Sequence, residues 1–364
     1  MSATDWLTRV LESDRLRLEV ELHPAQGQRF QPTGYPDLGP ATYRVPGGAD
    51  GGDTQMLLVE SPQSVANRLE SVCWDTAAQD VVAPLQGLPY VRVELEGDGE
   101  GPGVTASLLE AHRLNSPYVM HGQIGGRAFE EILRAESSIP QRSKPKKGAP
   151  AQGESSDGEE AEDGAGVGIV DARKIAKAAF HYDPNAVLHG VFLTQLDGRA
   201  RLTRILSGFI EAVNVREALS GGVKLDRVHA GGDTSQGYGN VPYARIEYVA
   251  QTIRAYFTLD VAMLRSYSLP QEAEVLLAVL ALWKIRRFLR TGLRLRTACD
   301  LEIGPDGLRV TAPAGLDVPG EDDLEHRLRI AIANCAPHWA SPPVTVLQRS
   351  IADGATAKAK KPKR

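Results

Sequence analysis

The 364-residue sequence lacks most of the features that mark disulfide-rich, zinc-binding and membrane proteins. Its three cysteines, Cys73, Cys299 and Cys335, are far apart and form no C-x-x-C pair, which predicts neither a zinc site nor a disulfide framework and fits a reducing compartment. The longest apolar run, VLLAVLALW at 275–283, is too short to cross a bilayer. The first residues show no signal-peptide pattern. We therefore expect a cytoplasmic protein without a membrane partner.

Local motifs for catalysis are also missing. The sequence has no G-x-S-x-G elbow, no H-E-x-x-H and no paired Cys-His spacing, and its eight histidines are scattered. His112 beside Arg113 could serve acid–base chemistry on RNA, and Asp233 could bind a metal ion, but the sequence supplies no partner for either. For Asp233 we favour an Asx turn. We expect no cofactor, no metal and no catalytic residue.

A formal net charge of -5 would ordinarily argue against a nucleic-acid partner. Part of that acidity lies in GESSDGEEAEDGAG at 153–166, a polar run that cannot bury enough apolar surface to order itself. We therefore expect a disordered low-complexity insertion at about 141–166 and a disordered basic tail at 352–364. The remaining chain is nearly neutral with basic stretches, so nucleic acid is not excluded.

Glycine is concentrated between two strand-like stretches at 223–248. Glycine N–H groups can approach an anion without a Cβ in the way, so this segment could form an anion-binding turn, with basic side chains at its edges. It is neither a Walker loop nor a dinucleotide fingerprint, because it ends in a strand-like pattern and lacks Gly-Lys-Ser or Gly-Lys-Thr. An irregular hairpin connection stays open as the structural alternative.

Hydrophobic periodicity predicts an α+β fold with mostly antiparallel strands and helices on one side. A helix is expected to start at Pro62, capped by Ser61, and to run to about 79. Two further helices are predicted at 271–290 and 321–335, and strands at 15–22, 54–60, 87–95, 186–196, 209–218, 242–249, 293–303 and 307–313.

Several segments carry a joint resemblance to a known family. They are RFQPTGYPDLG, ESPQSVANRLESVCWD, GLPYVRV, SLLEAHRLNSPYV, DPNAVLHGVFL, GGDTSQGYGNVPY and LWKIRRFLRTGLRLRTACDLE. Together they resemble the backbone subunits of CRISPR type I surveillance complexes, the Cas-seven group of the repeat-associated (RAMP) RNA-binding superfamily, in their type I-U (also called I-G) branch. The resemblance implies an RRM-like (ferredoxin-like) palm with inserted β-hairpins. On that basis we expect one elaborated domain over 1–351, with a thumb-like hairpin at about 87–135.

The resemblance also implies a function. Copies of such a subunit polymerise along a CRISPR RNA as a helical filament, assemble with other CRISPR effector subunits and present the guide for pairing with target DNA, without nuclease activity. A binder that accepts any spacer should contact phosphates and sugars and leave sequence reading to base pairing. By residue type and position in the matching segments, the expected RNA contacts are Gln63, Ser64, Asn67, Arg68, His112, Arg113, Asn115, Lys224, Arg227, Gly231, Gly232, Ser235, Gly237, Gly239 and Arg245.

Structural roles for some of these residues, and two other functions, stay open. Asn67 and Arg68 could be solvated helix residues, and Asn115 could belong to a turn. A ribonuclease acting on CRISPR precursor or target RNA, with His112 and Asp233 as its candidates, is the alternative function. A nucleotide- or sugar-phosphate-binding protein that uses the glycine-rich loop is a third.

Overall fold

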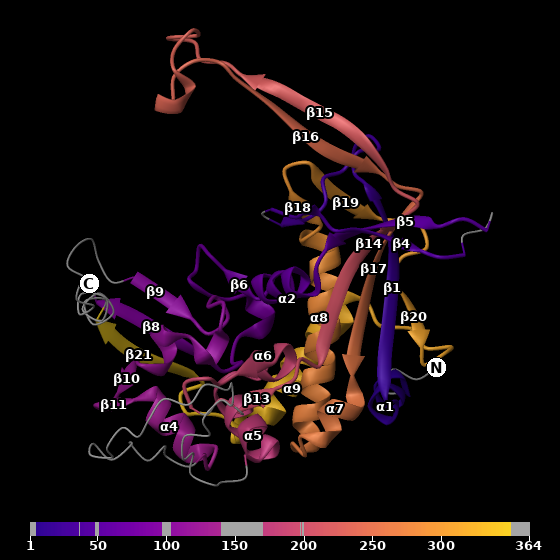
Figure 1. Ribbon diagram of the computed structural model, residues 1–364. Coiled ribbons are helices and arrows are strands. Elements are labelled where there is room, and N and C mark those ends of the chain that lie inside the picture. The colour runs from indigo at the N-terminus through magenta and orange to yellow at the C-terminus, as the bar shows by residue number, and fades with distance from the viewer. Residues whose placement is uncertain are drawn as a thin grey trace, which may run out of the picture. The chain divides into compact units, whose positions relative to one another are not determined.

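The computed structural model describes residues 5–35, 37–47, 51–96, 103–139, 170–196, 198 and 200–350, and they fall into two compact units. Unit 1 comprises Met1–Leu85, Ile205–Met263 and Glu274–Ala331, and unit 2 comprises Gln86–Arg204, Leu264–Ala273 and Ile332–Arg364 (Figure 1). The sequence led us to expect a single elaborated domain, whereas each unit has a sheet of its own. The insertion and the basic tail expected at 141–166 and 352–364 lie outside the described residues.

Unit 1 is built on an eight-stranded antiparallel sheet. Along the sheet the order is β18 (Arg294–Arg296), β19 (Cys299–Ile303), β1 (Arg15–Pro24), β17 (Thr252–Asp260), β14 (Leu206–Val213), β5 (Thr54–Glu60) and β4 (Thr42–Val45), and β20 (Arg309–Ala312) pairs with β1.

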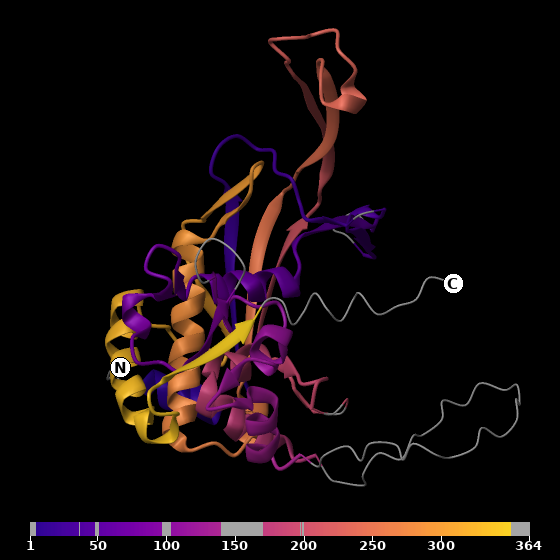
Figure 2. The ribbon, with the colours of Figure 1, turned by 90° about the vertical axis from the view of Figure 1, so that its left-hand side faces the viewer.

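Alternation in the sequence directs one face of this sheet into the core. Along β1 every second side chain from Leu16 to Leu22 is buried, and the same holds for β17 from Ile253 to Leu259. Two helices, α8 (Gln271–Thr291) and α9 (Glu321–Cys335), lie on one side of the sheet (Figure 2). The rings of Phe257 and Phe288 meet edge to face at 6.2 Å between centroids, which joins β17 to α8.

Smaller elements complete unit 1. The helix α2 (Pro62–Ser71) begins as the sequence predicted, because Ser61 Oγ accepts the N–H of Ser64 at 3.3 Å and Pro62 occupies the first turn. It ends about eight residues earlier than predicted, since Asp75 accepts the N–H groups of Ala77 and Ala78 and closes a turn instead. The others are α1 (Asp5–Glu12), β2 (Gly34–Tyr35), β3 (Gly39–Pro40), β6 (Trp74–Asp75), β7 (Asp80–Val81), a 3₁₀ turn at Ala83–Leu85 and the first half of α7 (Val261–Ser266), whose second half belongs to unit 2.

Unit 2 contains a five-stranded sheet in the order β11 (Arg127–Ala128), β10 (Gln123–Ile124), β21 (Val344–Ser350), β8 (Tyr90–Glu96) and β9 (Gly103–Ala106). The strands β21 and β8 are parallel, and β8 and β9 are antiparallel. Around the sheet lie 3₁₀ turns at Arg113–Asn115 and Ala336–His338, a two-stranded pair of β12 (Val191–Phe192) and β13 (Arg201–Leu202), and the helices α3 (Pro117–Met120), α4 (Phe129–Glu136), α5 (Ala172–Tyr182) and α6 (Pro184–His189).

The strand expected at 186–196 is wrong for most of its length. Pro184–His189 form the helix α6, because Asp183 accepts the N–H of Asn185 at 2.9 Å and Pro184 presets the first turn. The mixed α+β class is nevertheless confirmed. Among the described residues, no helix combines the length and apolarity needed to span a membrane.

Candidate nucleic-acid interface

The glycine-rich segment lies at the end of a long hairpin of unit 1. Its strands β15 (Arg216–Lys224) and β16 (Val241–Val249) pair with each other and extend beyond the main sheet as a two-stranded ribbon (Figure 1). At the base of the ribbon, Tyr248 also forms an isolated bridge with Phe30. The register runs without interruption from Arg216 opposite Val249 to Lys224 opposite Val241. Since residues directly opposite each other point to the same side, this register assigns every side chain to one of two faces.

The two faces of the hairpin differ in chemistry. We name the polar face by Ser220, Gly222, Lys224, Tyr243 and Arg245, and the apolar face by Leu219, Val223, Pro242, Ala244 and Ile246. The apolar side chains are open to solvent, with Leu219 83% and Ile246 41% exposed. Only the base of the ribbon, at Glu247 and Tyr248, is buried. Apolar side chains that stay exposed along the rest of the ribbon mark it as a contact surface.

At the tip, one carboxylate organises the chain. Asp226 accepts the N–H groups of Val228, His229 and Gly239 at 2.8, 3.0 and 2.8 Å. The N–H groups of His229, Gly239 and Val228 together lower the pKa of this carboxyl. Asp226 thereby closes the loop between the two strands.

The glycines allow the backbone of the tip to adopt this closed conformation. Gly237 and Gly239 have φ of 86° and 80°, in the left-handed region, and a Cβ at Gly239 would overlap the carbonyl oxygen of Gly232. The N–H of Gly232 donates to His229 O at 2.9 Å, that of Gly237 to Thr234 O at 3.2 Å and that of Gly239 to Asp226. Three of the four expected anion-binding N–H groups thus have acceptors within the tip itself. Phosphate binding by these glycines, including the exposed Gly231, stays a prediction.

Asp233 forms the Asx turn that the sequence favoured, which confirms that interpretation. Its Oδ1 accepts the backbone N–H of Ser235 at 2.9 Å and the Ser235 hydroxyl at 2.8 Å. The hydroxyl hydrogen bond, followed by the backbone one, lowers the pKa of Asp233. Ser235 therefore lies in the tip with its hydroxyl engaged by a neighbour.

The three basic residues of the hairpin have different surroundings. Lys224 and Arg227 are exposed, and within the described part of the chain neither forms an ion pair. Arg245 instead pairs with the buried carboxylate of Glu247 at 2.7 Å, which Arg29 also approaches at 3.6 Å. Two arginines around one carboxylate leave net positive charge at the base of the polar face.

A hollow of about 800 Å³ lies between the tip and the ends of the two strands. Lys224 of the polar face and Val241, which stands opposite it in the register, line the hollow together with His229 and Tyr238. The rings of His229 and Tyr238 lie 6.3 Å apart in a tilted arrangement. The polar face therefore continues into a concave surface with an aromatic wall.

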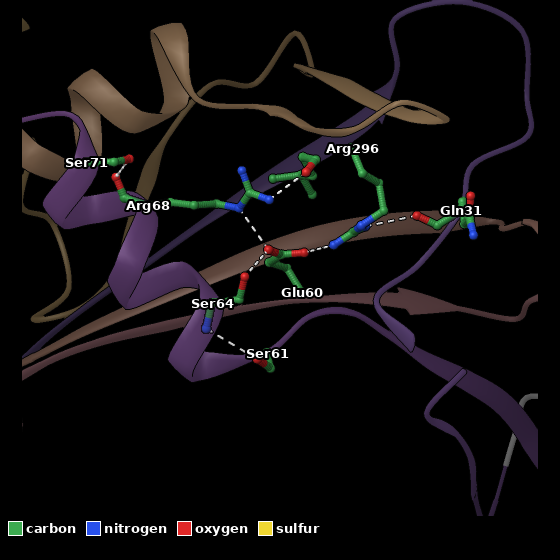
Figure 3. A network of polar contacts seen from close by, with 8 residues as sticks. Gln31, Glu60, Ser61, Ser64, Arg68, Ser71 and Arg296 are labelled. Carbon is green, nitrogen blue, oxygen red and sulfur yellow. Dashed lines mark hydrogen bonds and ion pairs between the residues drawn. The ribbon is translucent and has the colours of Figure 1, made fainter. Parts of the chain in front are cut away.

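The residues expected on α2 divide into two groups. Gln63 and Asn67 are exposed and hydrogen-bonded to each other at 3.0 Å. Ser64 and Arg68 point to Glu60, a carboxylate with no exposed surface; Arg68 Nε donates to it at 2.8 Å and the Ser64 hydroxyl also donates (Figure 3). Their polar groups are thus used inside unit 1.

Glu60 has a further partner that the sequence did not suggest. Arg296 of β18 donates to the other carboxylate oxygen and, through Nη1, to Gln31 O at 2.9 Å, while Arg68 donates through Nη2 to Leu295 O at 2.6 Å (Figure 3). The network ties α2, β18 and the loop around Gln31 to one buried charge.

The residues expected near 112–115 belong to unit 2. His112 is exposed, but Arg113 is buried and donates to Gly190 O at 3.2 Å. Asn115, also buried, donates to Thr194 Oγ1 at 2.9 Å and accepts the N–H of Gln195 at 3.1 Å. The side chains of Arg113 and Asn115 thus have hydrogen-bond partners within unit 2. The expected RNA contacts of α2 and of the hairpin lie in unit 1.

Comparison with protein families gives a match. The family model described as CRISPR-associated protein GSU0053 matches residues 16–217, more than half of the chain. The chain belongs to this family. Membership of the GSU0053 family confirms the association with CRISPR that the sequence resemblance implied. The matched span includes α2 and residues 112–115 but only the first residues of the hairpin.

Two solved structures show distant similarity to this GSU0053 family member. A chain of a "CRISPR RNA-guided surveillance complex, pre-nicking" is 13% identical, with 88% of this chain and 87% of that chain covered and a TM-score of 0.36. The Csc2 protein of Thermofilum pendens is 10% identical, with 92% and 80% covered and a TM-score of 0.32. No curated protein sequence matches the chain. The family match alone decides the assignment.

Sequence reasoning missed Tyr243 in this GSU0053 family member. The residue stands in the segment VPYARIEY, where the alternating pattern indicates a strand but does not reveal which face is apolar. Only the register with β15 places Tyr243 beside Lys224 and Arg245, on the face opposite Ile246.

Proposed function

We propose that this chain is the backbone subunit of a CRISPR type I surveillance complex of the I-U (I-G) branch. Copies of it polymerise along a CRISPR RNA as a helical filament, assemble with other effector subunits in the cytoplasm and present the guide for pairing with target DNA. Membership of the CRISPR-associated GSU0053 family is the observation that carries the proposal. In this proposal the main sheet of unit 1 is the RRM-like palm.

The hairpin β15–β16 supports an RNA-binding role. It combines exposed cations on one face with exposed apolar side chains on the other, as a scaffold that contacts both a polyanion and protein requires. We assign the thumb to this ribbon. The segment at about 87–135, where the sequence led us to expect the thumb, contributes β8, β9, β10 and β11 to the sheet of unit 2.

We propose that the subunit is not an enzyme and that the RNA contacts are made without catalysis. Asp233, one of the two candidates for a ribonuclease, is used in its own Asx turn, and His112, the other, lies in unit 2. Among the described residues, no group of three His, Cys, Asp or Glu side chains is arranged to hold a metal ion. These observations favour a scaffold over a nuclease.

The test is to express the chain with and without a CRISPR RNA and to measure the mass and the 260/280 nm absorbance ratio of the purified particle. A large particle that contains RNA, and is absent without it, is the expected result. A small RNA-free particle, or cleavage of a labelled repeat RNA that is lost in both H112A and D233A, would reject the scaffold function.

A further inference from the structure

Tyr243 occupies an unusual position on the polar face of the hairpin. It stands directly opposite Gly222 in the register, and the edge of its ring lies over that glycine. A Cβ at Gly222 would lie 3.1 Å from the Tyr243 hydroxyl oxygen and 3.3 Å from Cε1 and Cζ. The missing side chain therefore lets the ring lie low across the ribbon, an arrangement in which an aromatic residue covers a strand glycine.

The ring is supported but not enclosed. Tyr243 remains 44% exposed, and among the described residues no third strand pairs with the ribbon at its level, since the bridge of Phe30 lies at Tyr248. An aromatic ring fixed from below by the backbone and open to solvent is a platform on which another flat group can stack. Cross-strand packing alone explains the contact with Gly222 but leaves the exposed surface of the ring unused.

Cations stand on both sides of the ring along the same face. Arg245 follows two residues later on β16, and Lys224 lies opposite Val241, two residues earlier. By strand rise each is about 7 Å from the level of Tyr243. The nearest carboxylate on this face, Glu247, is buried and contacted by both Arg245 and Arg29. The face therefore offers an aromatic surface between two positive charges.

The opposite face carries no such combination. Leu219, Val223, Pro242, Ala244 and Ile246 supply neither a charge nor an aromatic ring. At the base of this face Glu217 is an anion and the ring of Tyr248 is buried, so no exposed ring stands beside a cation. Alternating rings and cations suit single-stranded nucleic acid, because every base has a π-face and each nucleotide carries a phosphate. Such stacking tolerates any sequence, as a guide with a variable spacer requires.

We propose that Tyr243 is a base-stacking residue for the CRISPR RNA, which runs along the polar face with phosphates at Lys224 and Arg245. The inference rests on the proposed function, because it takes the guide RNA as the occupant. Gly222 is the positioning residue, since it allows the ring to lie against the strand.

Two readouts on the full-length protein test this assignment. The first is affinity for a single-stranded RNA too short to hold two copies, so that contacts between copies do not contribute, in the variants Tyr243→Ala, Tyr243→Phe and Ile246→Ala. The matched control Ile246 lies on the opposite face of the same strand and is 41% exposed, close to the 44% of Tyr243. We expect about tenfold weaker binding for Tyr243→Ala, and binding near the parent level for Tyr243→Phe and Ile246→Ala.

The second readout is photocrosslinking of the unmodified protein to an RNA containing 5-iodouridine, which does not depend on any variant folding. Attachment at Tyr243 is expected. Equal losses in Tyr243→Ala and Ile246→Ala, or an RNA-bound particle whose crosslinks map only to other residues, would overturn the stacking role and leave the scaffold function intact. An unmodified protein that binds no RNA would reject both. Equal Tyr243-dependent binding of a DNA strand would overturn the choice of RNA.

Discussion

Glu60 and Arg296, 236 residues apart in the chain, form an ion pair inside unit 1. Arg68 contributes a second guanidinium to the same carboxylate. Each arginine also donates to a backbone carbonyl, of Gln31 and Leu295 respectively, so the charged groups fix main chain as well as one another. Arg68 and Ser64, two residues expected at the RNA, thus have a role in holding α2 in place.

Replacing Glu60 should destabilise unit 1. In Glu60→Gln the two guanidiniums lose their counter-charge, and we expect a loss of about 3 kcal/mol in the free energy of unfolding. The estimate is at the low end for a buried pair because both arginine side chains are about a quarter exposed. Urea denaturation measures it. The matched control Glu217→Gln, on the exposed start of the hairpin, should change stability by less than about 0.5 kcal/mol. Equal effects in both variants would contradict the role of the network.

Much of the fold follows from local pattern. The strand β5 and the helix α9 have the predicted bounds, and β1 and α8 differ from them by two residues or fewer, because their apolar periodicity agrees with their final burial. At Pro184–His189 the capping by Asp183 overrode an apolar run that suggested a strand.

The candidate site was less predictable, for a physical reason. Residue type indicates that Arg68 or Arg113 can bind phosphate, but not whether a distant acceptor such as Glu60 or Gly190 already holds it. The faces of the hairpin depend on strand register, which the sequence at 216–249 does not specify. Lys224 and Arg227 stay exposed, and the structure adds Tyr243 to them.

The tip of the hairpin should loosen in acid. The lowered pKa of Asp226 means that its carboxylate stabilises the tip above the pKa of the unfolded chain, about 3.9. That contribution is lost as the pH falls through the lower, folded-state pKa. An NMR titration of the Gly239 amide should show a midpoint below 3.9 that disappears in Asp226→Asn. A midpoint at or above 3.9 would contradict the hydrogen bonds described for this carboxylate.

Two glycines of the tip should respond differently to alanine. In Gly239→Ala the new Cβ meets the carbonyl of Gly232, whereas at Gly237 a Cβ would find no atom within 4 Å, and the two residues share a positive φ. Gly239→Ala should therefore raise hydrogen exchange or proteolysis at 225–240 well beyond Gly237→Ala, which carries backbone strain alone. Identical behaviour of the two variants would mean that steric fit at Gly239 does not hold the tip together.

The exposed cations of the hairpin should set the salt dependence of RNA binding. Each phosphate contact to a single strand contributes about 0.7 to the slope of log K against log salt, so Lys224→Ala with Arg227→Ala should reduce the slope by about 1.4. Leu225→Ala, a neutral change at an exposed residue between the two, is the control. An unchanged slope in the double variant would remove these residues from the interface.

The central claim is that copies of this chain assemble along a guide RNA, and guide length tests it most directly. The measurement is the native mass of particles purified with CRISPR RNAs whose spacers are lengthened a few nucleotides at a time. The account predicts that the number of copies rises in whole steps as the spacer grows. A copy number that stays constant across all guide lengths would contradict it.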